Sequence, residues 1–210
     1  QIDALADGGF VVTWVDFSRS GDDTDGSAVR GQRFDANGAK VGAEFLVNTK
    51  VDGSQTNGDV AGTSDGGFVM VFADSSLQGD QYSLRLQKFG ADGAKVGAEV
   101  VFEGPAGIFV GQPQVVALSS GGVAVVWEAS RRTGPDTQSS SIWVQEFDAA
   151  GQPVGPAELV NQVTTGSQSS PSVALLDGGR LFISWEDSSG RGGAGASATL
   201  VFPEHFLACR

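Results

Sequence analysis

Short apolar runs alternate with glycine-rich turns along the whole chain, and one apolar run recurs four times. Its copies read DGGFVVTW, DGGFVMVF, SGGVAVVW and DGGRLFISW, and they close on Trp14, Phe72, Trp127 and Trp185. These closing aromatic residues follow one another at intervals of 58, 55 and 58 residues (72−14, 127−72 and 185−127). A fixed period in this range predicts an array of repeats in which each unit covers the hydrophobic face of its neighbour.

Four β-rich runs fit into each period, and no helical periodicity interrupts them. The first runs are short and span residues 2–6, 60–63, 115–118 and 173–176. The second is the recurring apolar run, whose β-branched and aromatic residues predict a strand that is buried on both faces. A third run ends at Phe34, Phe89 or Phe147, and a turn such as DANG leads to a fourth. These turns have the acid or glycine first and the glycine fourth that tight hairpins use.

Four-stranded antiparallel units of this length, each with one aromatic anchor, are typical of propeller blades. We therefore predict an all-β fold, a β-propeller with about four repeats of 55–58 residues. The repeats span approximately residues 1–57, 58–111, 112–169 and, incompletely, 170–202. Residues 203–210 do not continue the pattern and form a non-repeat tail. A β-solenoid or a tandem β-sandwich array is the alternative architecture.

An array that stays open leaves unpaired strand edges at its ends, which invite association with other chains. We therefore expect the chain either to close as four blades or to form a symmetric homodimer that closes a larger ring.

The charge balance excludes two classes of partner. The chain holds 25 acidic and 13 basic residues, which gives a net charge of −12. Such a surface repels the phosphates of nucleic acids and the headgroups of anionic lipids. No apolar run is long enough to cross a bilayer. We therefore expect neither nucleic-acid binding nor membrane insertion.

An acidic residue follows each closing aromatic residue by one or two positions. Because equivalent strand ends lie on one face of a propeller, these acids are predicted to form a circle that accepts hydrogen bonds from sugar hydroxyls, next to aromatic faces that stack on the ring. The candidate ligand-binding residues are Asp16, Asp74, Glu128, Glu186 and Asp187, with Trp14, Trp127 and Trp185. In the alternative, the acids and the serines that follow them cap turns, and the aromatic residues pack between blades.

The densest carboxylate cluster is the sequence DDTDG, with Asp22, Asp23 and Asp25. Calcium prefers several oxygen ligands from a flexible loop with aspartates at alternate positions and a glycine at the bend. These residues are the candidate metal ligands, and calcium is the expected cofactor if one is present. The cluster lacks the downstream bidentate acid of a complete calcium loop, so a solvated loop is the alternative.

The catalytic inventory is small. The only histidine, His205, and the only cysteine, Cys209, lie in the non-repeat tail. No G-x-S-x-G nucleophile elbow and no phosphate-binding loop are present. A carboxylate pair of the glycosidase kind remains available, but the sequence does not pair the acids. We assign no catalytic residue.

The run GGFVVTW, followed by an acidic loop and VRGQRFDANGAKVGAEFLVNT, resembles the tandem β-repeats of large secreted bacterial adhesin-like and RTX-type calcium-binding proteins. The resemblance covers residues 1–202 and is clearest in 7–49. It implies a secreted or cell-surface location and a role in display or adhesion, and it supplies no catalytic residues. The calcium-binding nonapeptide GGxGxDxUx of RTX proteins does not occur in the chain.

Together these features predict a non-catalytic structural or binding module of a large exported bacterial surface protein, which a cation could stabilise. A glycan or another surface ligand is the expected partner. The alternatives are a carbohydrate-binding, lectin-like propeller and a hydrolase that uses carboxylates.

Overall fold

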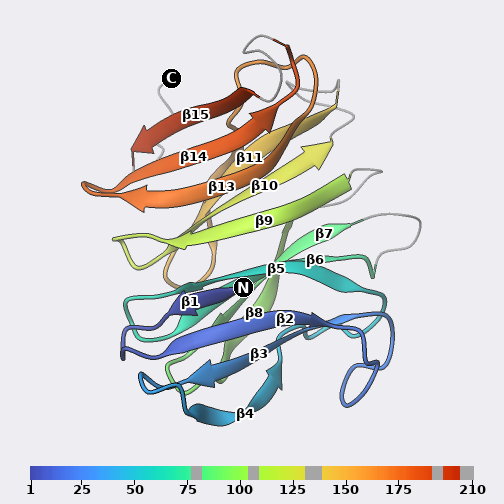
Figure 1. Cartoon of the computed structure of the whole chain (residues 1–210), viewed down its shortest axis with the longest axis vertical. Coiled ribbons are helices and arrows are strands. Elements are labelled where there is room, and N and C mark those ends of the chain that lie inside the picture. Colours follow the sequence, from blue (N-terminus) through green and yellow to red (C-terminus); the bar gives the residue numbers. More distant parts are fainter. Residues whose placement is uncertain (77–81, 104–108, 131–138, 191–195, 204–210) are drawn as a thin grey trace.

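The computed structural model describes residues 1–76, 82–103, 109–130, 139–190 and 196–203, and it is built from β-strands. Three four-stranded sheets and one three-stranded sheet follow one another along the chain, and all strand pairs in them are antiparallel (Figure 1). Each sheet is made of consecutive strands. The structure thus confirms the predicted all-β fold of antiparallel blades.

The strands of the four blades have the following bounds. Blade 1 consists of β1 (Ile2–Ala4), β2 (Phe10–Asp16), β3 (Ala28–Phe34) and β4 (Lys40–Leu46). Blade 2 consists of β5 (Gln55–Gly62), β6 (Phe68–Asp74), β7 (Ser83–Phe89) and β8 (Lys95–Glu103). Blade 3 consists of β9 (Phe109–Ala117), β10 (Val123–Ser130), β11 (Ser140–Phe147) and β12 (Pro153–Leu159). Blade 4 consists of β13 (Gln168–Leu176), β14 (Arg180–Asp187) and β15 (Ala196–Pro203).

The paired glycines of the recurring run have a steric cause. Gly8 has a φ of 83°, a conformation that costs glycine little. A Cβ atom on Gly9 would lie 2.3 Å from the carbonyl oxygen of Phe34, which no side chain tolerates. The hairpin between the first two strands therefore requires glycine at both positions, and the first three blades share this geometry.

The hydrophobic core lies between the blades. The closing aromatic residue of each of blades 2 and 3, Phe72 and Trp127, is completely buried. Phe72 packs in a cluster with Val11 and Val29 of blade 1, and Trp127 packs with Val71 and Leu86 of blade 2. Each blade therefore covers the aromatic face of the blade that follows it, as the repeat pattern predicts.

The innermost strands β5, β9 and β13 begin earlier than the apolar runs predict. They start at residues 55, 109 and 168, whereas the apolar runs start at 60, 115 and 173. Each of these strands contains a β-bulge, and a bulge shifts the alternation of side chains between the two faces. Polar residues ahead of the bulge are therefore still part of the strand.

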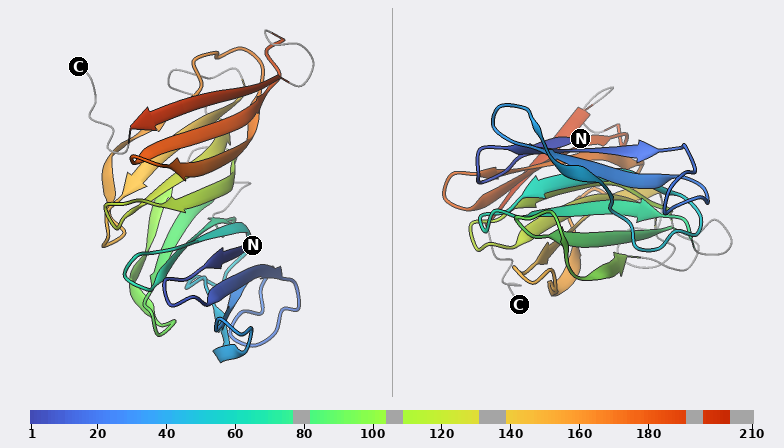
Figure 2. Two further views of the ribbon diagram at one scale, coloured as in Figure 1. Left: turned by 60° about the vertical axis from the view of Figure 1, so that its left-hand side comes forward. Right: turned by 90° about the horizontal axis from the view of Figure 1, so that it is seen from below.

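Blades 1 and 4 lie at opposite ends of the molecule, and both orientations show the blades as an open series (Figures 1 and 2). The four blades thus do not close into a ring of their own. The end of the tail, residues 204–210 with His205 and Cys209, lies outside the described residues. In the part of the chain that the structure describes, no helix is long and apolar enough to cross a membrane.

Candidate functional site

The three bulges occupy the same place in their blades, opposite the closing aromatic residue. In β9, Gly111 pairs with Glu128 and Gln114 pairs with Val126, so two residues, 112–113, oppose Trp127. The same count places residues 170–171 of β13 opposite Trp185 and residues 57–58 of β5 opposite Phe72. Bulges redirect side chains and are frequent beside functional sites.

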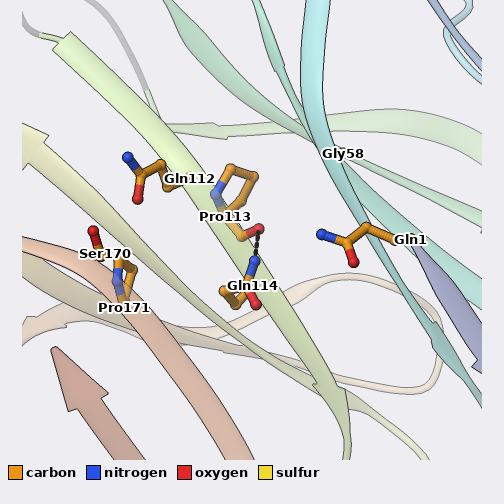
Figure 3. Close-up of a pocket in the computed structure, with 7 residues that line it drawn as sticks. All are labelled: Gln1, Gly58, Gln112, Pro113, Gln114, Ser170 and Pro171. Atoms are coloured by element: carbon orange, nitrogen blue, oxygen red, sulfur yellow. Dashed lines mark hydrogen bonds between the residues drawn. The ribbon is translucent and has the colours of Figure 1, made fainter. Parts of the chain in front are cut away.

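These bulges surround a pocket, which we call the inner-strand pocket, of about 260 Å³. Its volume lies just below the usual range for small-molecule sites, about 300–1,000 Å³. In Figure 3, the side chain of Gln1 points toward β9 from one side, and Ser170 and Pro171 lie on the other. The lining residues are Gln1, Gly58, Gln112, Pro113, Gln114, Ser170 and Pro171.

Two lining residues have a strained backbone. Gln112 and Ser170 have φ values of 50° and 54°, in the left-handed region that residues other than glycine rarely occupy. Both residues are exposed to solvent, and each is followed by a buried proline, Pro113 or Pro171. Strain of this kind persists where the surrounding structure imposes it and is concentrated at functional sites.

The polar side chains that line the pocket are neutral. Gln1, Gln112 and Gln114 contribute amides, and Ser170 contributes a hydroxyl group. Gln114 Nε2 donates a hydrogen bond to the carbonyl oxygen of Pro113 at 3.1 Å. Amides and hydroxyls both donate and accept hydrogen bonds, so they complement the hydroxyl groups of a sugar.

Asp59 is the acid nearest to the pocket in sequence. It pairs with Val71 just before Phe72, the register at which Gln114 pairs with Val126 in blade 3. It does not line the pocket, because its Oδ2 accepts a hydrogen bond from the Val115 amide at 2.9 Å. Burial raises the pKa of the Asp59 carboxyl, against the hydrogen bonds from backbone amides that lower it, and the charge of Asp3 adds to the rise.

The predicted acids Asp16, Asp74 and Asp187 lie at equivalent strand ends but hold their own blades together. Each carboxylate accepts hydrogen bonds from the backbone amide and the hydroxyl of the serine two residues later. Asp74 is completely buried and also binds Arg85 and Gln55. Burial acts to raise the pKa of Asp74, but these hydrogen bonds and the charge of Arg85 hold it below its usual value. Turn capping, the alternative interpretation, accounts for these contacts.

The other predicted ligand-binding residues differ in exposure. Trp127 is completely buried, Trp185 is 6% exposed, and Trp14 is half-buried. Glu128 is buried, whereas Glu186 is exposed. Packing between blades therefore accounts for Trp127 and Trp185, and only Trp14 offers part of its ring to solvent. None of these residues lines the inner-strand pocket, and their binding role stays a prediction.

The predicted calcium ligands do not converge. Asp23 is buried and accepts hydrogen bonds from Asn48 Nδ2 at 2.8 Å and from the amide of Asp25 at 3.2 Å. Asp25 accepts a hydrogen bond from the Gly53 amide at 3.1 Å, and Asp22 is exposed. Among the described residues, no three histidine, cysteine, aspartate or glutamate side chains form a group that could hold a metal ion. Calcium binding stays a prediction.

The sequence pattern pointed to the strand ends and missed the pocket. A usable signal was present, because Pro113 and Pro171 are separated by 58 residues (171−113), the same interval as Trp127 and Trp185. A proline that recurs just ahead of an apolar strand run indicates a bulge.

Comparisons with known proteins define the fold. No protein-family model and no curated protein sequence matches the chain. Its structure is similar to that of a Hadza microbial sialidase, Hz136, with a TM-score of 0.65 at 14% identity over 96% of this chain. An α-L-arabinofuranosidase from Lactobacillus brevis gives a TM-score of 0.59 at 15% identity over 98% of the chain, and a thermostable family-43 glycoside hydrolase gives 0.57 at 14% over 95%. The chain spans 44%, 68% and 69% of these three proteins.

These similarities confirm the β-propeller fold and correct two predictions. The resemblance to adhesin-like and RTX-type repeats is wrong, because the solved structures that share this fold are glycoside hydrolases and a sialidase. The repeat phrase reflects the hairpins that any blade of this kind needs, so it does not identify that family. The prediction of a non-catalytic module of an exported surface protein is contradicted by the same comparisons.

Proposed function

We propose that this chain is part of a carbohydrate-active propeller and that a glycan occupies the inner-strand pocket. The observation that carries the proposal is the neutral amide and hydroxyl lining, which the strained bulges of β9 and β13 present to solvent. The similarity to propellers described as an arabinofuranosidase and a family-43 glycoside hydrolase supports it. Because polymeric glycans are met outside the cell, we extend the proposal to a secreted or cell-surface location.

The ligand that this lining favours is a neutral sugar. An anionic sugar such as sialic acid calls for a cationic partner for its carboxylate, and no basic residue lines the pocket. The net charge of −12 also repels anions. We therefore choose arabino-oligosaccharides as the first candidates and sialyllactose as the anionic comparison.

Asp59 is the residue that we assign to bond cleavage. Hydrolysis of a glycoside requires one carboxylic acid that protonates the leaving oxygen and a second carboxylate on the other side of the bond. An acid with a raised pKa keeps its proton closer to neutral pH and can donate it. Asp3, in the adjacent strand β1, is the second candidate, and its Oδ2 accepts a hydrogen bond from the Gly62 amide at 2.7 Å.

Calorimetric titration with arabino-oligosaccharides tests the binding step. We expect binding by the parent chain, weaker binding of sialyllactose, and a loss of about 2- to 10-fold in affinity in Gln112→Ala, the effect of one net hydrogen bond. Gln152→Ala, which removes an exposed amide from the turn between β11 and β12, is the matched control and should bind normally. Equal affinities of both variants would reject the pocket as the binding site.

Release of reducing ends from the same oligosaccharides tests the catalytic step. Asp59→Asn preserves the shape of the side chain but removes the ionisable proton, so we expect binding to persist and hydrolysis to disappear. Asp92→Asn, an exposed turn residue, is the control. Unchanged turnover in Asp59→Asn would exclude Asp59 as the acid.

A further inference from the structure

The outer side of blade 1 carries an apolar surface that no other blade covers. We call it the first-sheet face, and it is formed by β1, β2 and the end of β3. Phe10 and Phe34 stack on it with ring centroids 4.9 Å apart. Ile2 pairs with Val12 on the same side. The residues of this face are Ile2, Phe10, Val12, Trp14 and Phe34.

The corresponding residues of blade 2 are buried. They occupy the same register positions and are only 0–4% exposed, because blade 1 packs against them. They are Val60, Phe68, Met70, Phe72 and Phe89. The equivalent residues of blade 3 are 0–7% exposed under blade 2. They are Val115, Val123, Val125, Trp127 and Phe147.

In blade 1 these positions are open instead. Ile2 is 64% exposed, and Phe10, Val12, Trp14 and Phe34 are half-buried. The side chains are as apolar as those in blades 2 and 3, so the difference comes from the missing neighbour and not from the sequence. A contiguous apolar surface of this kind indicates an interface.

Blade 4 exposes the other half of the same interface at the opposite end of the molecule. Phe182 follows Leu181 at the register of Val11 and Val69, which are 0% and 3% exposed where they cover the next blade. Phe182 itself is only half-buried. Leu176 is likewise half-buried, whereas its counterpart Leu118 in blade 3 is 4% exposed. We call Leu176 and Phe182 the fourth-sheet face.

We infer that a second copy of this chain docks on the first-sheet face through its fourth-sheet face. One molecule carries both halves of a contact that it already makes three times internally, between blades 1 and 2, 2 and 3, and 3 and 4. Because the two halves are different surfaces, the contact runs head to tail, and it either closes a ring or continues into a longer assembly. This inference is independent of the proposed glycan binding.

Analytical ultracentrifugation over a range of protein concentrations tests the inference. The parent chain should associate into multiples of 21.5 kDa. Val12→Lys places a charge in the centre of the first-sheet face and should weaken association by about tenfold or more, the effect of losing a central apolar contact. Val154→Lys, on the outer strand β12 where the valine is 51% exposed, should associate like the parent.

A mixing experiment separates this head-to-tail contact from non-specific association. Phe182→Lys damages the fourth-sheet face, so it and Val12→Lys should each be monomeric alone. Their mixture retains one intact face from each variant and should form a one-to-one complex. Circular dichroism establishes that each variant is folded, and acrylamide quenching of Trp14, the one half-buried tryptophan among the described residues, should fall as the parent chain associates. A parent chain that stays monomeric at all concentrations, or association that Val12→Lys leaves unchanged, would overturn the inference.

Discussion

Asp59 in β5 accepts a hydrogen bond from the backbone amide of Val115 in β9, with 2.9 Å between oxygen and nitrogen. Asp3 makes a similar contact from β1 to the amide of Gly62 in β5, at 2.7 Å. Two carboxylates therefore tie three successive innermost strands to one another. They fix the spacing of the strands whose bulges form the inner-strand pocket, so the pocket depends on contacts between blades as well as on the strands themselves.

The buried carboxyl of Asp59 should cost stability at neutral pH. Burial raises its pKa, so the folded protein retains the proton to a higher pH than the unfolded chain. The free energy of unfolding then falls as the pH rises from the unfolded pKa, about 3.9, through the folded pKa. Asp59→Asn lacks this titration and can still accept the hydrogen bond from Val115. We expect its melting temperature to exceed that of the parent at pH 7 and the difference to shrink toward pH 3.

A thermal melt series from pH 3 to pH 7 measures this effect. Asp92→Asn, at an exposed turn position, serves as the control and should follow the parent at every pH. A parent that gains stability over Asp59→Asn as the pH rises would show that the ionised carboxylate is favoured in the fold.

Removal of the buried Asp74 carboxylate should be severe. Arg85 binds both Asp74 and Glu99, and the three side chains are 12%, 0% and 6% exposed. Asp74→Ala leaves the Arg85 guanidinium and the Gln55 amide without their partner, a loss typically of about 3–5 kcal/mol. Urea denaturation of the parent and the variant gives the difference in free energy of unfolding.

Asp16→Ala is the matched comparison for this experiment. Asp16 makes the same kind of contacts, with Arg30 and Ser18, but its side chain is 19% exposed and water can replace them. We expect a clearly smaller loss. Equal losses in both variants would show that burial is not what makes the Asp74 contact strong.

The pKa of Asp65 should depend on a lysine in the same blade. The hydrogen bond from Lys88, with a further one from Thr63, lowers the pKa of Asp65 to about 2. Lys88 Nζ also donates to the Ala149 carbonyl of blade 3, both at 2.8 Å. The stability that this pair contributes is present above the unfolded pKa and is lost as the pH falls toward 2.

Nuclear magnetic resonance titration of the Asp65 carboxyl checks this dependence. In Lys88→Met the pKa should rise toward the ordinary value of 3.8. Lys40→Met, which removes an exposed lysine from the start of β4, should leave it unchanged. An unaltered pKa in Lys88→Met would assign the shift to Thr63 and the turn backbone.

Gly122 should tolerate alanine far less well than Gly42. A Cβ atom on Gly122 would lie 2.1 Å from the Phe147 carbonyl oxygen, so the hairpin backbone must move. Overpacking of this kind costs about 1–3 kcal/mol. Gly42 has a φ of 72° but open space around its Cα, so its alanine variant carries only the cost of the left-handed backbone, about 1–2 kcal/mol. Thermal or urea unfolding of both variants decides the order.

Local chemistry made the blades predictable. The recurring apolar run, the paired glycines such as Gly8 and Gly9, and the closing aromatic residues specify strands and hairpins through contacts within a few residues or with the next strand. The repeat period then predicts that the blades stack on one another. Bulges were not predicted, because two residues facing one change the alternation of side chains without leaving an apolar signature.

The candidate site depended on the tertiary structure. Gln1, Gln112 and Ser170 are separated by more than a hundred or by 58 residues (170−112), and only the packing of blades brings them around one pocket. The sequence also could not distinguish Trp14 from Trp127, which share a repeat position but differ in exposure. Strand formation follows from the order of neighbouring residues. The burial of an indole, the pKa of an acid and the lining of a pocket follow from which blade lies opposite, and that is settled only when the chain has folded.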